Sequence, residues 1–239
     1  DNTNPHGSNG YSPSDERPDR SAWDAQKSSS NTNDLRGKII RIKPLPNGTY
    51  VIPDGNLFSK GTALARPEIY TMGHRNPFRI SVDKKTGYVY WGEVGPDANA
   101  PDSLRGPAGH DEVGQAKQAG NYGWPHFVGD NKAYTRFDFL QNKSLEKWSA
   151  EKPINTSPNN TGLQELPTTQ KAFIWYPYGE SKEFPLVGNG GRNAMAGPVF
   201  YSEDFKTAAR ALPNYYEGKL FIYDWMRGWI MSVTLDKEG

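Results

Sequence analysis

Carboxylates, an arginine, an asparagine and two aromatic residues are gathered between residues 73 and 130, and glycines and prolines separate them. The stretch holds four short motifs: Gly-His-Arg-Asn-Pro at 73–77, Gly-Glu-Val-Gly-Pro-Asp at 92–97, His-Asp-Glu at 110–112 and Gly-Asn-Tyr-Gly-Trp-Pro at 120–125. An arginine offers a planar fork of donors that suits carboxylate-like ligands. Carboxylate and carbonyl oxygens are the ligands that calcium takes in loose geometry. These residue types could serve an anionic ligand or a metal ion, or they could be a turn with solvated side chains and the solvated acids of a loop.

The first two motifs lie on either side of a predicted β-hairpin. Residues 78–83 alternate as a strand does, Lys-Lys-Thr-Gly at 84–87 forms a turn, and Tyr-Val-Tyr-Trp at 88–91 forms the returning strand. The chemically capable residues are therefore expected at strand ends and in the loops beyond them, where rigid β scaffolds usually present function.

Composition excludes several classes of function. The chain has 239 residues and a net charge of +1, from 28 basic and 27 acidic residues, so it lacks the clustered basic face of a nucleic-acid binder. Apolar runs such as 220–223 are too short to span a bilayer. The absence of cysteine excludes disulfides, thiolate zinc sites and cysteine nucleophiles, and fits an exported bacterial protein. No signal peptide is visible and the chain opens on Asp1, which indicates a mature or excised segment.

The balance of residue types predicts an all-β fold with long polar loops. The chain has 25 glycines and 19 prolines, which could indicate disorder, but its 7 tryptophans and 13 tyrosines argue against that, because disordered chains are poor in aromatic residues. The polar segment 1–36 is interpreted as a long ordered loop, with disorder as the alternative. No second domain or linker is visible, and no strict period of about 40–50 residues emerges.

Short strands are predicted along most of the chain, at 38–43, 50–52, 69–72, 78–82, 88–91, 172–176 and 197–201, with a closing hairpin at 218–224 and 229–236. The connections 97–121 and 126–171 are expected to be poor in strands. A short helix is predicted near 144–150, and one or two helical turns within 205–212.

The four motifs and their order resemble the soluble glucose/sorbosone dehydrogenases, which depend on pyrroloquinoline quinone and oxidise aldose sugars on a six-bladed β-propeller. The blade-opening strand of that family is matched by residues 33–42. The resemblance covers 35–130 well and 172–236 more weakly. It implies a partial propeller of roughly half the ring, a single segment 1–239 in which 1–34 is a polar insertion and 35–239 supplies blades. The chain is then a fragment of a larger protein.

The resemblance also implies a set of site residues. Arg75 and Asn76 correspond to the pair that contacts the quinone, and the carbonyls of Gly95 and Pro96 to those that hold its calcium ion. A further calcium site in the family corresponds to three positions here, with Asp111 as a weaker candidate: Glu112, Tyr122 through its backbone carbonyl, and Asp130.

The chain also departs from the family's pattern. The catalytic general base is a histidine, expected upstream of Asp1, and none of the chain's own histidines matches it: His6, His74, His110 and His126. A later cofactor-contacting lysine would align near Ser202, so that contact is expected to be missing. Whether His74 replaces a lost contact is left open.

The function expected from the resemblance is that of part of a quinone- and calcium-dependent dehydrogenase. It would oxidise an aldose to its lactone by hydride transfer, and the fragment alone would be inactive. Its partners would be the aldose, the remaining blades, and an electron acceptor or fused cytochrome domain, in the periplasm or outside the cell. A non-catalytic propeller that binds carbohydrate or a partner, and a calcium-dependent lactonase-type hydrolase, remain as alternatives.

Two features lie outside these motifs. Residues 15–20 alternate in charge, and could line a substrate cleft, although a solvated and self-paired loop is favoured. Arg192 follows a glycine-rich stretch and could contact an anionic group. Trp175, Tyr176 and Tyr178 could stack on a sugar ring or belong to the core.

Overall fold

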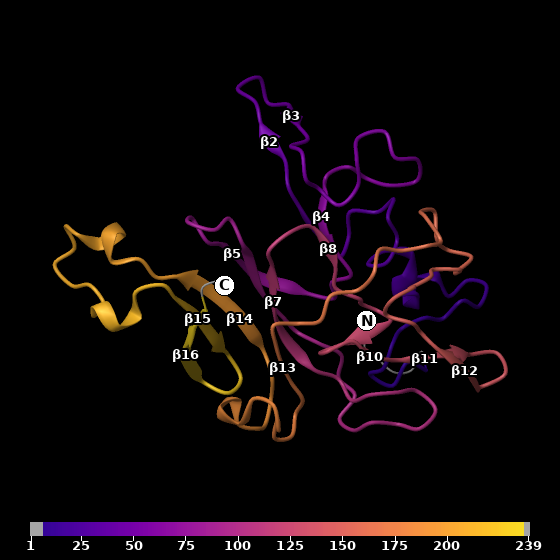
Figure 1. Ribbon diagram of the computed structural model, residues 1–239. Coiled ribbons are helices and arrows are strands. Elements are labelled where there is room, and N and C mark those ends of the chain that lie inside the picture. Colours follow the sequence, from indigo (N-terminus) through magenta and orange to yellow (C-terminus); the bar gives the residue numbers. More distant parts are fainter. Residues whose placement is uncertain (1–6, 237–239) are drawn as a thin grey trace.

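The computed structural model describes residues 7–236 as three β-sheets packed face to face, with long loops between their strands (Figure 1). The first sheet has the order β1 (Lys38–Ile40), β4 (Ile69–Met72), β8 (Gly120–Asn121). The central sheet has the order β13 (Ile174–Tyr176), β7 (Asp111–Ala116), β6 (Val89–Glu93), β5 (Pro77–Val82). The third has the order β14 (Ala194–Val199), β15 (Lys219–Asp224), β16 (Trp229–Thr234).

The remaining elements are short. Three two-stranded ribbons are formed by β2 (Lys43–Pro44) with β3 (Tyr50–Val51), β9 (Phe127–Val128) with β10 (Lys132–Ala133), and β11 (Thr135–Asp138) with β12 (Lys143–Lys147). Single 3-10 turns occur at η1 (Ser21–Trp23), η2 (Ala25–Lys27), η3 (Pro185–Val187), η4 (Ser202–Phe205) and η5 (Asn214–Tyr216). No helix in this part of the chain is long and apolar enough to span a membrane.

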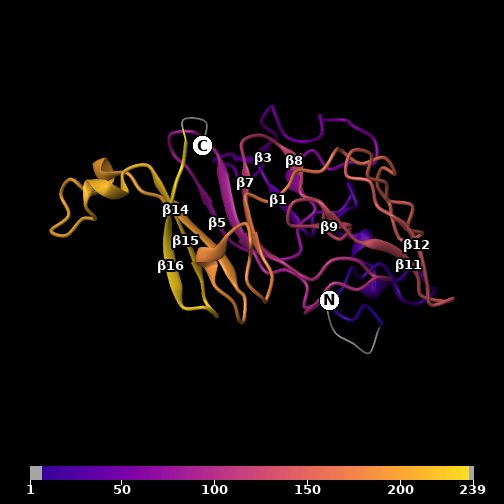
Figure 2. The same cartoon turned by 60° about the horizontal axis from the view of Figure 1, so that its bottom comes forward.

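Strand β6 is the middle of the core because alternate side chains on it face opposite neighbours. Val89 and Trp91 pack with the first sheet, in a cluster that contains Ile39 and Tyr70. Tyr90 packs with the third sheet. On that side a Cβ added at Gly92 would lie 2.1 Å from the Cα of Met195, so only glycine permits this close approach. The three layers are visible side by side in Figure 2.

The N-terminal polar segment is ordered from residue 7, as interpreted from the sequence, and it is held by buried hydrogen bonds to distant loops. The Ser29 hydroxyl donates to the carbonyl of His74 at 2.7 Å, and the Asn155 side-chain amide donates to the carbonyl of Gln26 at 2.8 Å. Residues 1–6 and 237–239, which include His6, lie outside the described residues. Hydrogen-bonded polar groups replace an apolar core in this region, although Oγ of Ser12 and Oε1 of Gln26 are buried without a partner.

The prediction of an all-β fold is confirmed, and β4 has the predicted bounds. Two expectations for the connections are wrong. Residues 97–121 contain the six-residue strand β7, and residues 143–147 form strand β12, paired with β11, in place of the predicted helix near 144–150. The helical turns expected within 205–212 are limited to η4, which ends at Phe205. The partial propeller of roughly half a six-bladed ring and the division at residue 34 stay predictions.

Candidate functional site

The carboxylate of Glu93, at the end of β6, holds the loop that connects β4 to β5. Its Oε1 accepts hydrogen bonds from the backbone N–H groups of Arg75 and Asn76, the latter at 3.2 Å. Its Oε2 lies 3.1 Å from Nδ1 of His74 and accepts from Nε1 of Trp91 at 3.2 Å. Glu93 is 4% exposed. Four donors on one buried carboxylate fix the direction in which residues 75 and 76 leave the loop.

His74 is fully buried and connects this carboxylate to β4. Its Nε2 lies 2.8 Å from Oγ1 of Thr71, and its ring stacks on Tyr122 at a centroid distance of 5.7 Å. Because the Glu93 carboxylate can only accept, Nδ1 of His74 carries a proton, and the Thr71 hydroxyl, which can donate or accept, pairs with Nε2. The histidine whose role the sequence left open therefore braces the loop from inside.

Arg75 and Asn76 emerge from this loop toward the surface. Arg75 is partly exposed and its Nη1 donates to the carbonyl of Val94 at 2.7 Å, while its Nε is buried without a partner. Burial lowers the pKa of Arg75, and the charges of Asp97, Glu93 and Asp111 oppose that shift. A guanidinium remains protonated in proteins, so Arg75 is a fixed cation. Asn76 is exposed.

Gly95 and Pro96 run against residues 109–110 at very short range. A Cβ added at Gly95 would lie 1.6 Å from the carbonyl oxygen of His110, and one added at Gly109 would lie 1.7 Å from the carbonyl oxygen of Pro96. Both positions therefore require glycine. The Gly95 N–H donates to Oδ1 of Asp111 at 3.0 Å, which ties this turn to the start of β7.

Asp111 and Arg192 form a buried ion pair behind the turn. The Nη1 of Arg192 lies 2.9 Å from Oδ1 of Asp111, and its Nη2 donates to the Pro96 carbonyl at 2.8 Å. Burial raises the pKa of Asp111 to about 6, while Arg192 and the N–H groups of Ala194 and Gly95 oppose the shift. Asp111 is then mostly ionised at neutral pH. The anionic group that Arg192 contacts is thus Asp111. The carboxylate of Asp111 accepts hydrogen bonds from Arg192 and from the N–H groups of Gly95 and Ala194.

Glu112, the next residue on β7, is far less satisfied. One oxygen accepts from the Gly129 N–H, and the other has no hydrogen-bond donor among residues 7–236. Burial raises the pKa of Glu112 well above its usual value, and the charge of Glu93 adds to this, while the Gly129 N–H opposes it. A carboxyl group in this state can gain by meeting a cation.

The last two predicted calcium ligands differ in position. Tyr122 is partly buried, and its hydroxyl donates to the Gln115 carbonyl at 2.8 Å. Asp130 is exposed and pairs with Lys132.

A small cavity of about 10 Å³ brings most of these residues together, and its volume suits a single ion or water molecule. Five of the seven sequence-predicted site residues line it, and Asn76 and Asp130 do not. Its lining consists of Arg75, Glu93, Gly95, Pro96, His110, Glu112, Tyr122, Trp124, Phe127 and Val128.

Five of these lining residues were not predicted as site residues, and two of the five, Glu93 and His110, have titratable side chains. The signal for Glu93 was its place directly after a buried strand and two residues before Gly-Pro. His110 gave no local signal. Burial lowers the pKa of His110 to about 4, so its ring is neutral at pH 7, with Nδ1 donating to the Ala108 carbonyl at 2.9 Å.

The donor set of the cavity suits a hard cation only if backbone oxygens take part. Within residues 7–236 no group of three or more His, Cys, Asp and Glu side chains could hold a metal ion. Calcium is the common ion that combines one or two carboxylates with backbone carbonyls and water. The free oxygen of Glu112 fits such a cation site. The unpartnered Nε of Arg75 is a donor on a cation, and it suits a ligand that carries acceptor oxygens.

Comparison with known proteins identifies the class. Residues 16–159 match the family model described as Glucose / Sorbosone dehydrogenase. The chain belongs to this family, as the resemblance in its motifs predicted. It is 30% identical to the aldose sugar dehydrogenase YliI of Escherichia coli (strain K12) over 170 residues, which are 71% of this chain and 33% of that protein. It is 31% identical to the HIPL2 protein of Arabidopsis thaliana over 119 residues, 44% of this chain and 15% of that protein.

The chain spans a third or less of the length of these curated relatives. Among solved structures, a glucose dehydrogenase aligns with a TM-score of 0.47 and 21% identity, over 88% of this chain and 44% of that one. The soluble aldose sugar dehydrogenase of Escherichia coli in the apo-form aligns with a TM-score of 0.46 and 19% identity, over the same shares of the two chains.

Proposed function

We propose that this chain carries the calcium-binding part of a sugar dehydrogenase that depends on pyrroloquinoline quinone and oxidises an aldose to its lactone. One observation carries the proposal: Arg75, Gly95, Pro96, Glu112 and Tyr122 converge on one ion-sized cavity. The family membership and the printed name of the Escherichia coli relative support the aldose as substrate class.

The cavity has room for an ion and not for a quinone, so its residues would serve the metal. Glu112 offers a free carboxylate oxygen, and Gly95, Pro96 and Tyr122 offer backbone carbonyls. Pro96 has already given one lone pair to Arg192. Asp130, outside the cavity, would need to leave Lys132 to join a calcium site.

Arg75 and Asn76 are the groups that would meet the quinone outside the cavity. When bound, the quinone would accept the hydride from the sugar. The fixed positive charge of Arg75 would favour negative charge that develops beside it. Glu93 would hold the backbone of Arg75, and the Val94 carbonyl would hold its guanidinium. Both residues leave a loop whose backbone N–H groups are already held, so little reorganisation is needed on binding.

The proton acceptor would come from outside the described chain. The described histidines are all buried, with exposures of 0% for His74, 7% for His110 and 1% for His126. None of them can therefore approach a substrate at Arg75 without rearrangement. The same proposal includes the partners of this chain, which are the remaining blades and an external electron acceptor or fused cytochrome domain. It also includes an exported location, in the periplasm or outside the cell.

Calorimetric titration of the whole protein that contains this chain, with the quinone and with and without calcium, tests the proposal. We expect quinone binding that needs calcium, and that weakens on Arg75→Ala but not on Arg79→Ala, a change on the exposed strand β5. Absence of quinone binding under both conditions would refute the proposal. Lactone hydrolysis with calcium alone would then point to the hydrolase, and carbohydrate binding without turnover to the non-catalytic propeller.

A further inference from the structure

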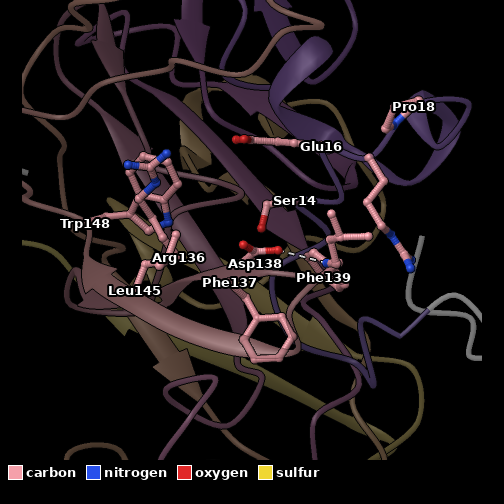
Figure 3. Close-up of a pocket in the computed structure, with 11 residues that line it drawn as sticks. Ser14, Glu16, Pro18, Arg136, Phe137, Asp138, Phe139, Leu145 and Trp148 are labelled. Carbon is pink, nitrogen blue, oxygen red and sulfur yellow. Dashed lines mark hydrogen bonds between the residues drawn. The ribbon is translucent and has the colours of Figure 1, made fainter.

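A second and larger cavity lies between the N-terminal segment and the β11–β12 ribbon (Figure 3). Its volume is about 280 Å³, large enough for a small organic molecule, and it does not share the lining of the ion-sized cavity. One wall is formed by residues 14–18 and the other by residues 136–148. The charged motif at 15–20, which the proposed function does not use, therefore does line a concave surface.

The two arginines at this cavity are neutralised by their own partners. Arg17 pairs with Asp15 at 2.6 Å, and Arg136 pairs with Glu146 at 2.5 Å. Neither guanidinium therefore dominates the charge of the cavity. The sequence favoured a self-paired loop for residues 15–20, and Asp15 and Arg17 do pair with each other.

The two lining carboxylates, in contrast, have no cationic partner within ion-pair distance among residues 7–236. Oε1 of Glu16 accepts from the side-chain amide of Gln26 at 2.9 Å. Oδ1 of Asp138 accepts from the N–H groups of Leu140 and Gln141 at 2.8 and 3.0 Å. Lys143 stands opposite Asp138 on β12 but forms no ion pair with it. The cavity lining therefore holds two carboxylates without an ion-pair partner, while the guanidinium of Arg105 lies behind the wall, 4.4 Å from the centre of the Phe137 ring.

A buried hydroxyl group offers a third polar contact at this cavity. Ser14 is 5% exposed and lines the cavity, yet its hydroxyl has no hydrogen-bond partner in the described part of the chain. The Ser14 hydroxyl is not one of the fully enclosed polar atoms without a partner, so either a water molecule or a ligand in the cavity can serve as its partner. In Figure 3 the Ser14 hydroxyl and the carboxylates of Glu16 and Asp138 point into the same space.

The rest of the wall is apolar, but it offers no free aromatic face for a sugar ring. Phe137 and Leu145 border the cavity. Trp148 is 6% exposed, because His126 stacks on it at 3.8 Å and the Arg136 guanidinium lies 5.1 Å from its ring centre. A ligand would therefore gain from hydrocarbon contact rather than from stacking on tryptophan.

We propose that this cavity binds a small organic ammonium ion. The ammonium group donates hydrogen bonds to Glu16, Asp138 and Ser14, and the hydrocarbon part lies on Phe137 and Leu145. A neutral polyol would only exchange hydrogen bonds to water for hydrogen bonds to protein, whereas a cation also gains the attraction of two carboxylates. This proposal is independent of the quinone and of the calcium cavity.

Calorimetric titration with n-butylammonium chloride tests the proposal, with n-butanol and glucose as neutral probes. We expect saturable binding of the ammonium ion alone, weaker at 0.5 M than at 0.05 M salt. Shortening the probe to methylammonium should weaken binding by about two- to fourfold for each methylene group removed.

Three isosteric variants locate the site. Glu16→Gln and Asp138→Asn remove one charge each while keeping the oxygen that accepts the internal hydrogen bonds, and each should weaken binding about fivefold or more. The matched control is Glu180→Gln, an exposed acid away from the cavity lining. Thermal melting checks that each variant is folded.

The possible results are decisive. Ammonium binding that falls in the first two variants and not in the control supports the proposal. Absence of saturable ammonium binding, equal weakening by the control, or glucose binding that survives Glu16→Gln would each overturn it.

Discussion

Replacing Glu93 by glutamine tests the central claim about the site, that one carboxylate fixes the loop bearing Arg75 and Asn76. Glutamine has nearly the same shape but offers one acceptor oxygen in place of two. If that oxygen keeps the N–H groups of residues 75 and 76, the new amide N–H₂ faces the two donors that Oε2 accepted, His74 and Trp91.

The magnitude follows from counting which donors can adapt. His74 can change tautomer, accept from the new amide, and donate to Thr71 instead, so its cost is small. The indole N–H of Trp91 cannot change, and a buried unpaired donor costs about 1–3 kcal/mol. The two retained bonds lose their charged acceptor, at up to about 1 kcal/mol each. Relief of burying a charge offsets part of this, so we expect a net loss of about 2–4 kcal/mol.

Thermal unfolding measures this loss. For a domain of 150–250 residues each kcal/mol corresponds to about 2–4 °C, so Tm should fall by about 4–16 °C in Glu93→Gln. Calcium affinity should fall as well, because Glu93 lines the cavity. The exposed Glu180→Gln is the control and should stay within about 2 °C. A Tm for Glu93→Gln that matches the control would refute the reasoning that four donors depend on this carboxylate.

Three further predictions concern acid stability, proton release and packing. Burial lowers the pKa of His126 to about 3, so the stability it contributes is complete above its unfolded pKa of about 6.5 and is lost as the pH falls toward 3. His126→Phe keeps a ring stacked on Trp148. Between pH 7 and pH 5, its free energy of unfolding in urea should fall by about 2 kcal/mol less than that of the native chain. An unchanged pH dependence of the free energy of unfolding would contradict this. Because the pKa of Glu112 is raised in the fold, its ionisation destabilises the fold as the pH rises toward that pKa. Calcium binding should therefore tighten with pH and release a proton. Titration in buffers of different ionisation enthalpy should detect this proton release in the native chain but not in Glu112→Gln. Gly92→Ala should lower the free energy of unfolding by about 2 kcal/mol or more, because the new methyl group meets the backbone of β14. Gly87→Ala is the comparison variant in the same melting experiment. Gly87 lies in an open turn with a positive φ, so that variant shows the cost of backbone strain without a clash.

Much of the fold could be predicted because the strands carry their own local signals. Strand β4 is four apolar or β-favouring residues with the predicted bounds, and β15 and β16 form the predicted closing hairpin. Strand β7 was missed because Asp-Glu-Val-Gly-Gln-Ala resembles a loop locally. It becomes a strand because Val113 and Ala116 are buried, and because Gly114 lets the Trp91 ring pack at the position of its missing Cβ. Tertiary context therefore overrides local propensity there.

The candidate site divides in the same way. The family motifs assigned Arg75 to the quinone, Gly95 and Pro96 to its calcium ion, and Glu112 and Tyr122 to a further calcium ion. The structure shows that all five line one cavity, and their assignment to ligands stays a prediction. Sequence alone could not identify Glu93 as the anchor of the loop or join Asp111 to Arg192, because the partners are 17 to 81 residues apart in the chain. Such pairings depend on which turns the packed sheets bring together, and no local pattern encodes them.

The chemistry expected of the cavity depends on how differently its two carboxylates are satisfied. Glu93 accepts from four donors of the chain and has no capacity left for a ligand, so its part is to orient Arg75 and Asn76. Glu112 accepts from one donor and lies close enough to Glu93 for that charge to raise its pKa further. A cation placed between them would offset the charge of Glu93, which adds to the rise that burial causes in the pKa of Glu112. A further hydrogen-bond donor on Glu93 would leave Glu112 as it is. One carboxylate of the pair therefore holds the loop, and the other keeps an oxygen for the proposed calcium ion; exchanging their partners would remove both roles.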